Sequence, residues 1–323
     1  MINSVAGNKS ATELHTTLPL ESDRNQERNN TKSKMSTVGI FGATGNIGQC
    51  LLPLLVSEPT IEEIRIITKR PEKIESEVKH AETGGTKIVV NKGDYCVDEG
   101  IVGETLRGCS RLFFVLPQSL SSQEMIQRGK FVVDCALASN VESVVRISSL
   151  GIDKQSIKFV GSQGPLGESH VAIEKYCEQV GLKQVSLRPT SLFSNIQFNV
   201  EEIASNSTIS TPLGNNAKVN WVSCEDVAKI AAKVLAATKW DEFGKIIDIT
   251  GPRENTLGAQ DMAQSISASV NRSIEYKETD IPPVPDFSGL WTFLRKGGYD
   301  CHCDIVEGIT GSPGQRFSEI KLI

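Results

Sequence analysis

The sequence contains no long apolar run and no strong excess of charge of either sign. Its longest strongly apolar stretch, residues 112–116, is far shorter than the roughly 20 residues that cross a bilayer. The 34 basic and 39 acidic residues give a net charge of −5, and no long Lys/Arg cluster occurs. We therefore expect a protein that binds neither a membrane nor nucleic acid.

The sequence also lacks the short motifs of several enzyme classes. It has no Gly-x-Ser-x-Gly elbow of the serine hydrolases and no Gly-Lys-Ser/Thr phosphate loop. Cys301-His302-Cys303 has no second Cys or His pair at zinc-ligand spacing, so no metal site is predicted. The eight cysteines are scattered, and no basic region followed by an apolar run marks the N-terminus. Both observations favour a cytoplasmic protein with reduced thiols.

Aromatic residues are scarce at 6%, yet the chain has enough apolar residues for a core. Apolar residues make up 39% of it, and the 27 glycines bring it to the usual globular level. The length of 323 residues fits two ordinary domains or one large α/β domain with an extension. Residues 1–34 are polar and without apolar periodicity, so we expect a disordered leader there.

Beyond this leader, short β-branched runs alternate with segments of helical periodicity. Ser121 with Glu124, and Ser223 with Asp226, are N-cap patterns that head two such helices. Apolar strands separated by helix-length crossovers are typical of a parallel sheet covered on both faces. The predicted fold class is α/β, a Rossmann-type doubly wound parallel sheet with a smaller C-terminal substrate-binding region. The predicted strands are 38–41, 64–68, 87–91, 112–116, 144–148, 184–187 and 245–249.

A glycine-rich segment lies between the first predicted strand and the first predicted helix. It has the spacing GxxGxxG, in the strand–turn–helix context that supports a dinucleotide-binding site. The first glycine permits a tight turn, the second lets the backbone approach a pyrophosphate, and the third lets helix and strand pack closely. The helix N-terminus supplies amides for the phosphates. The segment is Gly42-Ala43-Thr44-Gly45-Asn46-Ile47-Gly48.

The second strand indicates which dinucleotide binds. NAD sites place an acidic residue after this strand, but here it ends in Thr68-Lys69-Arg70. Two cations suit a 2′-phosphate, so the cofactor is predicted to be NADP(H), although a solvated basic turn is the alternative. Asp94, after the third strand, is either a contact to adenine or a turn residue. Pro117 and Gln118 follow the fourth strand, where the chain passes the cofactor, although Pro117 is also a residue that ends strands.

These residues, with several others in the same order, resemble the NmrA-like family of the atypical short-chain dehydrogenase/reductase superfamily. The resemblance covers roughly residues 36–315. It implies either an NADPH-dependent reductase of quinones, imines or secondary metabolites, or a regulator that binds NADP(H) without turnover. The further landmarks are Val144-Val145-Arg146-Ile147-Ser148-Ser149, Leu187-Arg188-Pro189-Thr190, Asn220-Trp221-Val222, Asp226-Val227-Ala228 and Ile249-Thr250-Gly251-Pro252.

The resemblance breaks at the catalytic residues. Superfamily enzymes carry a Ser after the fifth strand and a Tyr-x-x-x-Lys on the next helix. Here Ser148 or Ser149 matches the Ser, but Leu166 stands at the Tyr position and His170 at the Lys position. The candidate catalytic residues are Ser148, to orient a substrate carbonyl, and His170, whose ordinary pKa suits proton donation. A turn-forming role for Ser148 and a ribose-binding or surface role for His170 are the alternatives.

Two functions follow from this pattern. The first is an NADPH-dependent oxidoreductase that reduces a small apolar electrophile by hydride transfer without the Tyr–Lys pair. The second is an NADP(H)-sensing regulator that reports to a partner protein. In both, residues 35–190 form the Rossmann core that binds NADP(H). Residues 191–323 form a substrate-binding or lid region, from which the strand 245–249 returns to the sheet.

Overall fold

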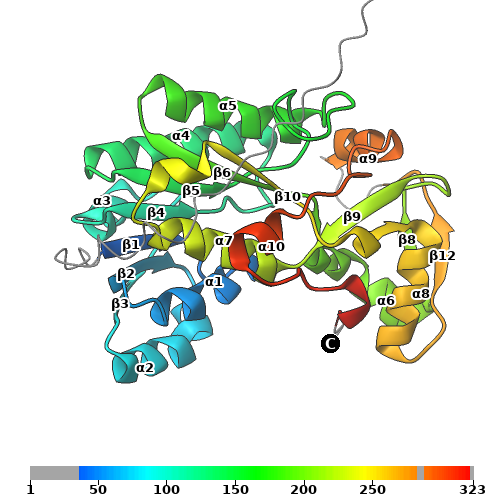
Figure 1. The fold of residues 1–323 in the computed structure, drawn as a ribbon, viewed down its shortest axis with the longest axis horizontal. Coiled ribbons are helices and arrows are strands. Elements are labelled where there is room, and N and C mark those ends of the chain that lie inside the picture. The colour runs from blue at the N-terminus through cyan, green and yellow to red at the C-terminus, as the bar shows by residue number, and fades with distance from the viewer. Residues whose placement is uncertain (1–35, 282–286, 321–323) are drawn as a thin grey trace, which may run out of the picture. The chain divides into compact units, whose positions relative to one another are not determined.

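A seven-stranded parallel sheet forms the centre of the fold (Figure 1). The structure, a computed structural model, describes residues 36–281 and 287–320, and the expected leader lies outside this part. The strand order is β10-β6-β5-β4-β1-β2-β3, and neighbouring strands run parallel throughout. Each of the seven predicted strands is confirmed. Their bounds are β1 Ser36–Phe41, β2 Ile61–Thr68, β3 Lys87–Lys92, β4 Arg111–Phe114, β5 Ser143–Ile147, β6 Lys183–Pro189 and β10 Ile246–Ile249.

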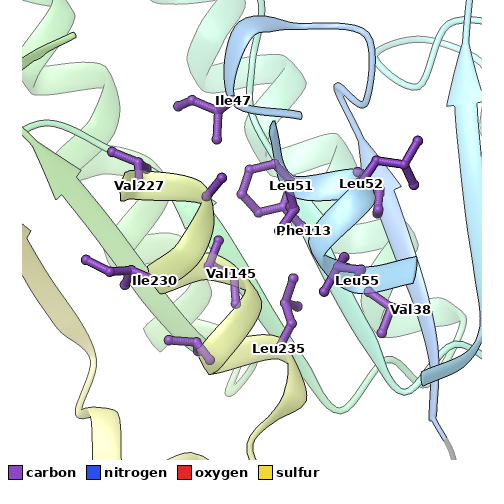
Figure 2. Close-up of a cluster of buried hydrophobic side chains, with 14 of the residues drawn as sticks. Val38, Ile47, Leu51, Leu52, Leu55, Phe113, Val145, Val227, Ile230 and Leu235 are labelled. Carbon is purple, nitrogen blue, oxygen red and sulfur yellow. The ribbon is translucent and has the colours of Figure 1, made fainter. Parts of the chain in front are cut away.

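Helices cover both faces of this sheet, as the doubly wound class requires. On one face, α1 (Asn46–Val56) packs against α7 (Cys224–Ala236), with α2 (Glu75–Gly84) and α10 (Ile305–Thr310) beside them. Figure 2 shows leucines of α1 and apolar residues of α7 meeting above Phe113 and Val145 of the sheet. The other face carries α3 (Glu99–Leu106), α4 (Ser122–Ala138) and α5 (Pro165–Gln179).

The two helix starts that the sequence marks are present. The Ser121 hydroxyl accepts a hydrogen bond from the Glu124 amide, and the Glu124 carboxylate accepts one from the Ser121 amide. This reciprocal pair is a capping box at the start of α4. At α7, the Ser223 hydroxyl accepts from the Asp226 amide at 2.9 Å.

The segments after β6 build a second, smaller cluster of elements. It contains a three-stranded sheet in the order β11-β9-β7 and a parallel pair of β12 with β8. Their own apolar core includes Trp221, Met262, Phe293 and Phe317. The elements are β7 Ser191–Leu192, α6 Val200–Asn206, β8 Thr208–Thr211, β9 Lys218–Val222, β11 Thr256–Gly258, α8 Ala259–Val270, β12 Glu275–Glu278 and α9 Ser288–Arg295.

All eight cysteines lie among the described residues, and each is a free thiol. In the part of the chain that the structure describes, no helix combines the length and the apolar character needed to cross a membrane.

Candidate active site

The glycine-rich turn joins β1 to α1 at the carboxyl edge of the sheet. Gly42 has a φ of +97°, a conformation that favours glycine. A Cβ on Gly48 would lie 2.1 Å from the carbonyl oxygen of Gly42, so a larger residue would force α1 away from the turn. Gly45 is the N-cap of α1 and has no side chain to occupy the first-turn amides. The turn therefore leaves a helix N-terminus open to an anion.

A groove of about 490 Å³ opens beside this turn and follows the ends of the first four strands. Ala43 is the one predicted cofactor residue that does not line it, because its side chain is fully buried in the core beneath the turn. Thr68, which precedes the two expected cations, also lines it, as do Lys73, Tyr95 and Gln197, which were not expected there. The predicted residues that the groove brings together are Gly42, Thr44, Gly45, Asn46, Ile47, Lys69, Arg70, Asp94, Pro117 and Gln118.

Three cations lie where the groove passes the end of β2. Lys69 is already engaged, because its Nζ lies 2.7 Å from Asp94 Oδ2. Burial alone would raise the pKa of Asp94, but the hydrogen bonds from Lys69 and from the Cys96 amide outweigh it and lower that pKa. Within the described residues, the side chains of Arg70 and Lys73 make no ion pair, and both line the groove. Positive charge is therefore available to a ligand at this end.

A second cavity, of about 140 Å³, adjoins the groove. Both predicted catalytic residues, Ser148 and His170, line it, together with Leu166. Leu166 and His170 lie one turn apart on α5, so they face the cavity as the family pattern implies. The two spaces adjoin, because both are lined by the same five residues, Ile47, Val115, Leu116, Gln118 and Leu192.

The hydroxyl proton of Ser148 is committed to a neighbouring carboxylate. Ser148 donates to Glu174 Oε1 at 2.7 Å, and its side chain is buried. Its oxygen therefore presents lone pairs rather than a proton to the cavity. That arrangement does not suit hydrogen-bond donation by Ser148 to a substrate carbonyl.

Arg146 determines the tautomer of His170, and burial together with nearby arginines determines its charge. A guanidinium nitrogen of Arg146 lies 3.1 Å from His170 Nδ1, and a guanidinium can only donate. Nδ1 is therefore an acceptor, and the ring proton is on Nε2. Loss of solvation, and then the charges of Arg146 and Arg188, lower the pKa of His170 to about 3. The ring is neutral at physiological pH, so the expected ordinary pKa is wrong for this environment.

Glu174 compensates the charges of two arginines buried beneath the cavity. Its carboxylate accepts from Arg146 at 3.3 Å and from Arg188 through both oxygens. Asp153 completes the group with two contacts of 3.0 Å to Arg188. Both arginines are at most 1% exposed, so their charges depend on these partners. The group ties α5 to β5 and β6 and so positions Ser148 and His170.

Tyr299 brings a phenol into the cavity from the far end of the chain. Its hydroxyl lies 2.7 Å from Ser149 Oγ, and Ser149 in turn donates to Gln163 Oε1 at 3.0 Å. Tyr299 is therefore the donor to Ser149. Burial is the main cause that raises the pKa of Tyr299 to about 12, so the phenol stays protonated. No sequence pattern predicts this pairing, because the two residues are 150 positions apart.

Two curated proteins resemble this chain over most of its length. Prestalk A differentiation protein A of Dictyostelium discoideum is 25% identical over 261 residues, which are 80% of this chain and 76% of that protein. Quinone oxidoreductase 2 of Escherichia coli K12 is 22% identical over 243 residues, which are 74% of this chain and 77% of that protein.

Solved structures with the same fold include two reductases and a regulator. The quinone oxidoreductase of Escherichia coli, complexed with NADPH, gives a TM-score of 0.70 at 18% identity over 87% of this chain and 97% of that one. The triphenylmethane reductase of Citrobacter sp., complexed with NADP(H), gives 0.69 at 18% identity over 87% and 98%. NmrA, a negative transcriptional regulator in complex with NADP, gives 0.62 at 14% identity over 88% and 90%.

A family model matches most of the same part of the chain. A model of the NmrA-like family matches residues 34–286, which include the glycine-rich turn, the groove, and Ser148 and His170 of the second cavity. The chain therefore belongs to the NmrA-like family.

Proposed function

We propose that this protein is an NADP(H)-dependent oxidoreductase that reduces a small apolar electrophile, such as a quinone, an iminium compound or an intermediate of secondary metabolism. The observation that carries the proposal is that the groove at the glycine-rich turn and the cavity lined by Ser148 and His170 share five wall residues. A dinucleotide and an electrophile in these spaces would be neighbours, as hydride transfer requires.

The residues of the groove fit a phosphorylated dinucleotide. The open N-terminus of α1 suits the pyrophosphate, and Gly45 lets the backbone approach it. Arg70, with Lys73, suits the 2′-phosphate, whereas Lys69 serves to neutralise Asp94. Gln118 lines both spaces and so belongs to the end where the nicotinamide would lie. When bound, the cofactor supplies the hydride.

His170 polarises the electrophile rather than protonating it. Its neutral Nε2–H is a hydrogen-bond donor at the cavity wall, suited to an oxygen on which negative charge develops. Quinones and iminium compounds are already activated and need less acid assistance than ketones. A site without the Tyr–Lys pair therefore suits these electrophiles.

Steady-state turnover tests this proposal. The full-length protein is mixed with NADPH and a panel of quinones, iminium compounds and enones, and the loss of NADPH absorbance is followed. We expect turnover of at least one class, with NADPH preferred over NADH. Replacing His170 with Leu, which removes the N–H donor, should lower kcat about 100-fold or more, by analogy with loss of an oxyanion donor. His302→Leu, at a histidine that instead contacts Gly251 and Asp304, is the matched control. Absence of NADPH consumption across the panel would refute the proposal.

A second candidate function is an NADP(H)-sensing regulator. The observation that favours it is the cavity itself, where Leu166 replaces the usual tyrosine and both the Ser148 and the Tyr299 protons are held by other groups. A sensor would bind NADPH and NADP+ with clearly different affinities and show no turnover. Calorimetric titration with the two forms separates the candidates, because equal affinities would exclude the sensor.

A further inference from the structure

A third cavity extends the proposed substrate site away from the dinucleotide groove. It has a volume of about 70 Å³ and shares Ser191, Asn195, Phe287 and Leu290 with the cavity that contains His170. Its lining is largely apolar and includes two tryptophans, Trp221 and Trp291, contributed by β9 and α9. The space is large enough for a small group attached to a ring but not for a long chain.

Three polar atoms on this lining are buried without a hydrogen-bond partner among the described residues. One is Trp221 Nε1, a donor, on a side chain that is only 8% exposed. The second is Asn195 Oδ1, an acceptor, and the third is Thr211 Oγ1, a hydroxyl that can donate or accept. All three residues line the same small cavity, yet these atoms do not bond to one another. Nine in ten buried polar groups are hydrogen-bonded, so three such atoms at one cavity indicate a ligand group that pairs with them.

We propose that this cavity binds a hydroxyl group of the substrate. A hydroxyl can accept from Trp221 Nε1–H and donate to Asn195 Oδ1, whereas a carbonyl satisfies only the tryptophan and a methyl satisfies neither. The substrate class is therefore an apolar, ring-containing electrophile with a hydroxyl substituent remote from the carbon that is reduced. This inference rests on the proposed function for the reducible end of the ligand, but the subsite itself concerns binding alone.

The test uses two naphthoquinones that differ in one group on the ring that is not reduced, a hydroxyl in one and a methyl in the other. Their dissociation constants are measured by calorimetry on the full-length protein saturated with NADP+, and their KM values are measured with NADPH. We expect the hydroxylated compound to bind about tenfold more tightly. Trp221→Phe, which keeps an aromatic ring but removes the N–H, should abolish this preference by weakening only the hydroxylated compound.

Matched variants guard against a general effect on the cavity. Trp291→Phe makes the same change of ring on another wall of the same cavity and should leave the hydroxyl preference in place. Asn195→Leu should remove the preference as Trp221→Phe does, and it keeps the test available if Trp221→Phe unfolds. Thermal unfolding of each variant is measured alongside.

The outcomes separate this inference from the proposed function. Equal affinity for the two naphthoquinones in the unmodified protein would overturn the subsite and leave ordered water as the partner of the three atoms. Persistence of the preference in both Trp221→Phe and Asn195→Leu would also overturn it. A hydroxyl preference in binding without NADPH consumption would support the subsite and refute the reductase.

Discussion

The glycine-rich turn allows the binding of the cofactor to be tested apart from the stability of the fold. Gly45 lies in extended backbone, with φ −87° and ψ 171°, and the nearest atom to an added Cβ would be the Gly42 carbonyl oxygen at 3.3 Å. Gly45→Ala should therefore change the free energy of unfolding by less than about 1 kcal/mol. The added methyl group would still obstruct a pyrophosphate at α1. We expect the Kd for NADPH to rise about 10-fold to 100-fold, the value of one charge-assisted hydrogen bond.

Gly48→Ala is the matched comparison, because it adds the same methyl group three residues later. Here the Cβ would lie 2.1 Å from the Gly42 carbonyl oxygen and 2.7 Å from Ala43 Cα, both backbone atoms that cannot rotate away. The alanine gains about 1 kcal/mol of helix propensity, but overpacking against the backbone costs roughly 3 kcal/mol, which leaves a net loss of about 2 kcal/mol. Its main effect is therefore on stability.

Urea unfolding and NADPH titration of the two full-length variants check this reasoning. If Gly45→Ala leaves the NADPH affinity unchanged, the pyrophosphate does not bind at this turn. Equal losses of stability in the two variants would show that the close approach at Gly48 does not control packing.

Three further predictions concern charge. Arg70→Glu should raise the Kd for NADPH about 30-fold or more and leave that for NADH nearly unchanged, as titration with both would show. The pKa of His170 is about 3 in the native state, below its value in the unfolded chain. As the pH falls, the unfolded chain therefore binds a proton at this imidazole before the folded protein does. Urea unfolding should therefore show stability falling by roughly 1 kcal/mol per unit below about pH 6.5, and His170→Gln should remove this contribution. Glu174→Gln leaves Arg146 and Arg188 undercompensated and should cost roughly 3–5 kcal/mol in the same assay; a smaller loss would mean that Asp153 suffices.

The sheet and the turn were predictable because their signals are local. Most strands of the central sheet are short runs rich in apolar residues, and the capping box at Ser121 lies within four residues. The spacing of Gly42, Gly45 and Gly48 carries its own geometric requirement. Such features need no knowledge of which distant segments meet. The glycine spacing also predicted that residues 42–47 all bind the cofactor, whereas the Ala43 side chain is buried in the core.

The chemistry of the second cavity was not predictable, because distant residues decide it. The pKa of His170 depends on its burial and then on the charges of Arg146 and Arg188, which lie on β5 and β6. The pairing of Lys69 with Asp94 spans two strands, and that of Ser149 with Tyr299 spans half the chain. Sequence spacing identified which residue types stand at these positions, but not which of them hold protons or charge.

The packing of α7 on α1 has a consequence for folding while the chain is being synthesised on the ribosome. Leu51 and Leu55 lie on the apolar side of α1, the helix that follows the glycine-rich turn. Val227 and Ile230 of α7 cover this side and are synthesised some 175 residues later (Figure 2). The outer edge of β6 likewise stays unpaired until β10 emerges. A nascent chain that has completed only its first six strands therefore carries exposed leucines and an open sheet edge, the two features that invite aggregation. Translation must pass residue 249 before this half can close. Until then, the exposed leucines and the open edge of β6 are the sites that a chaperone would bind.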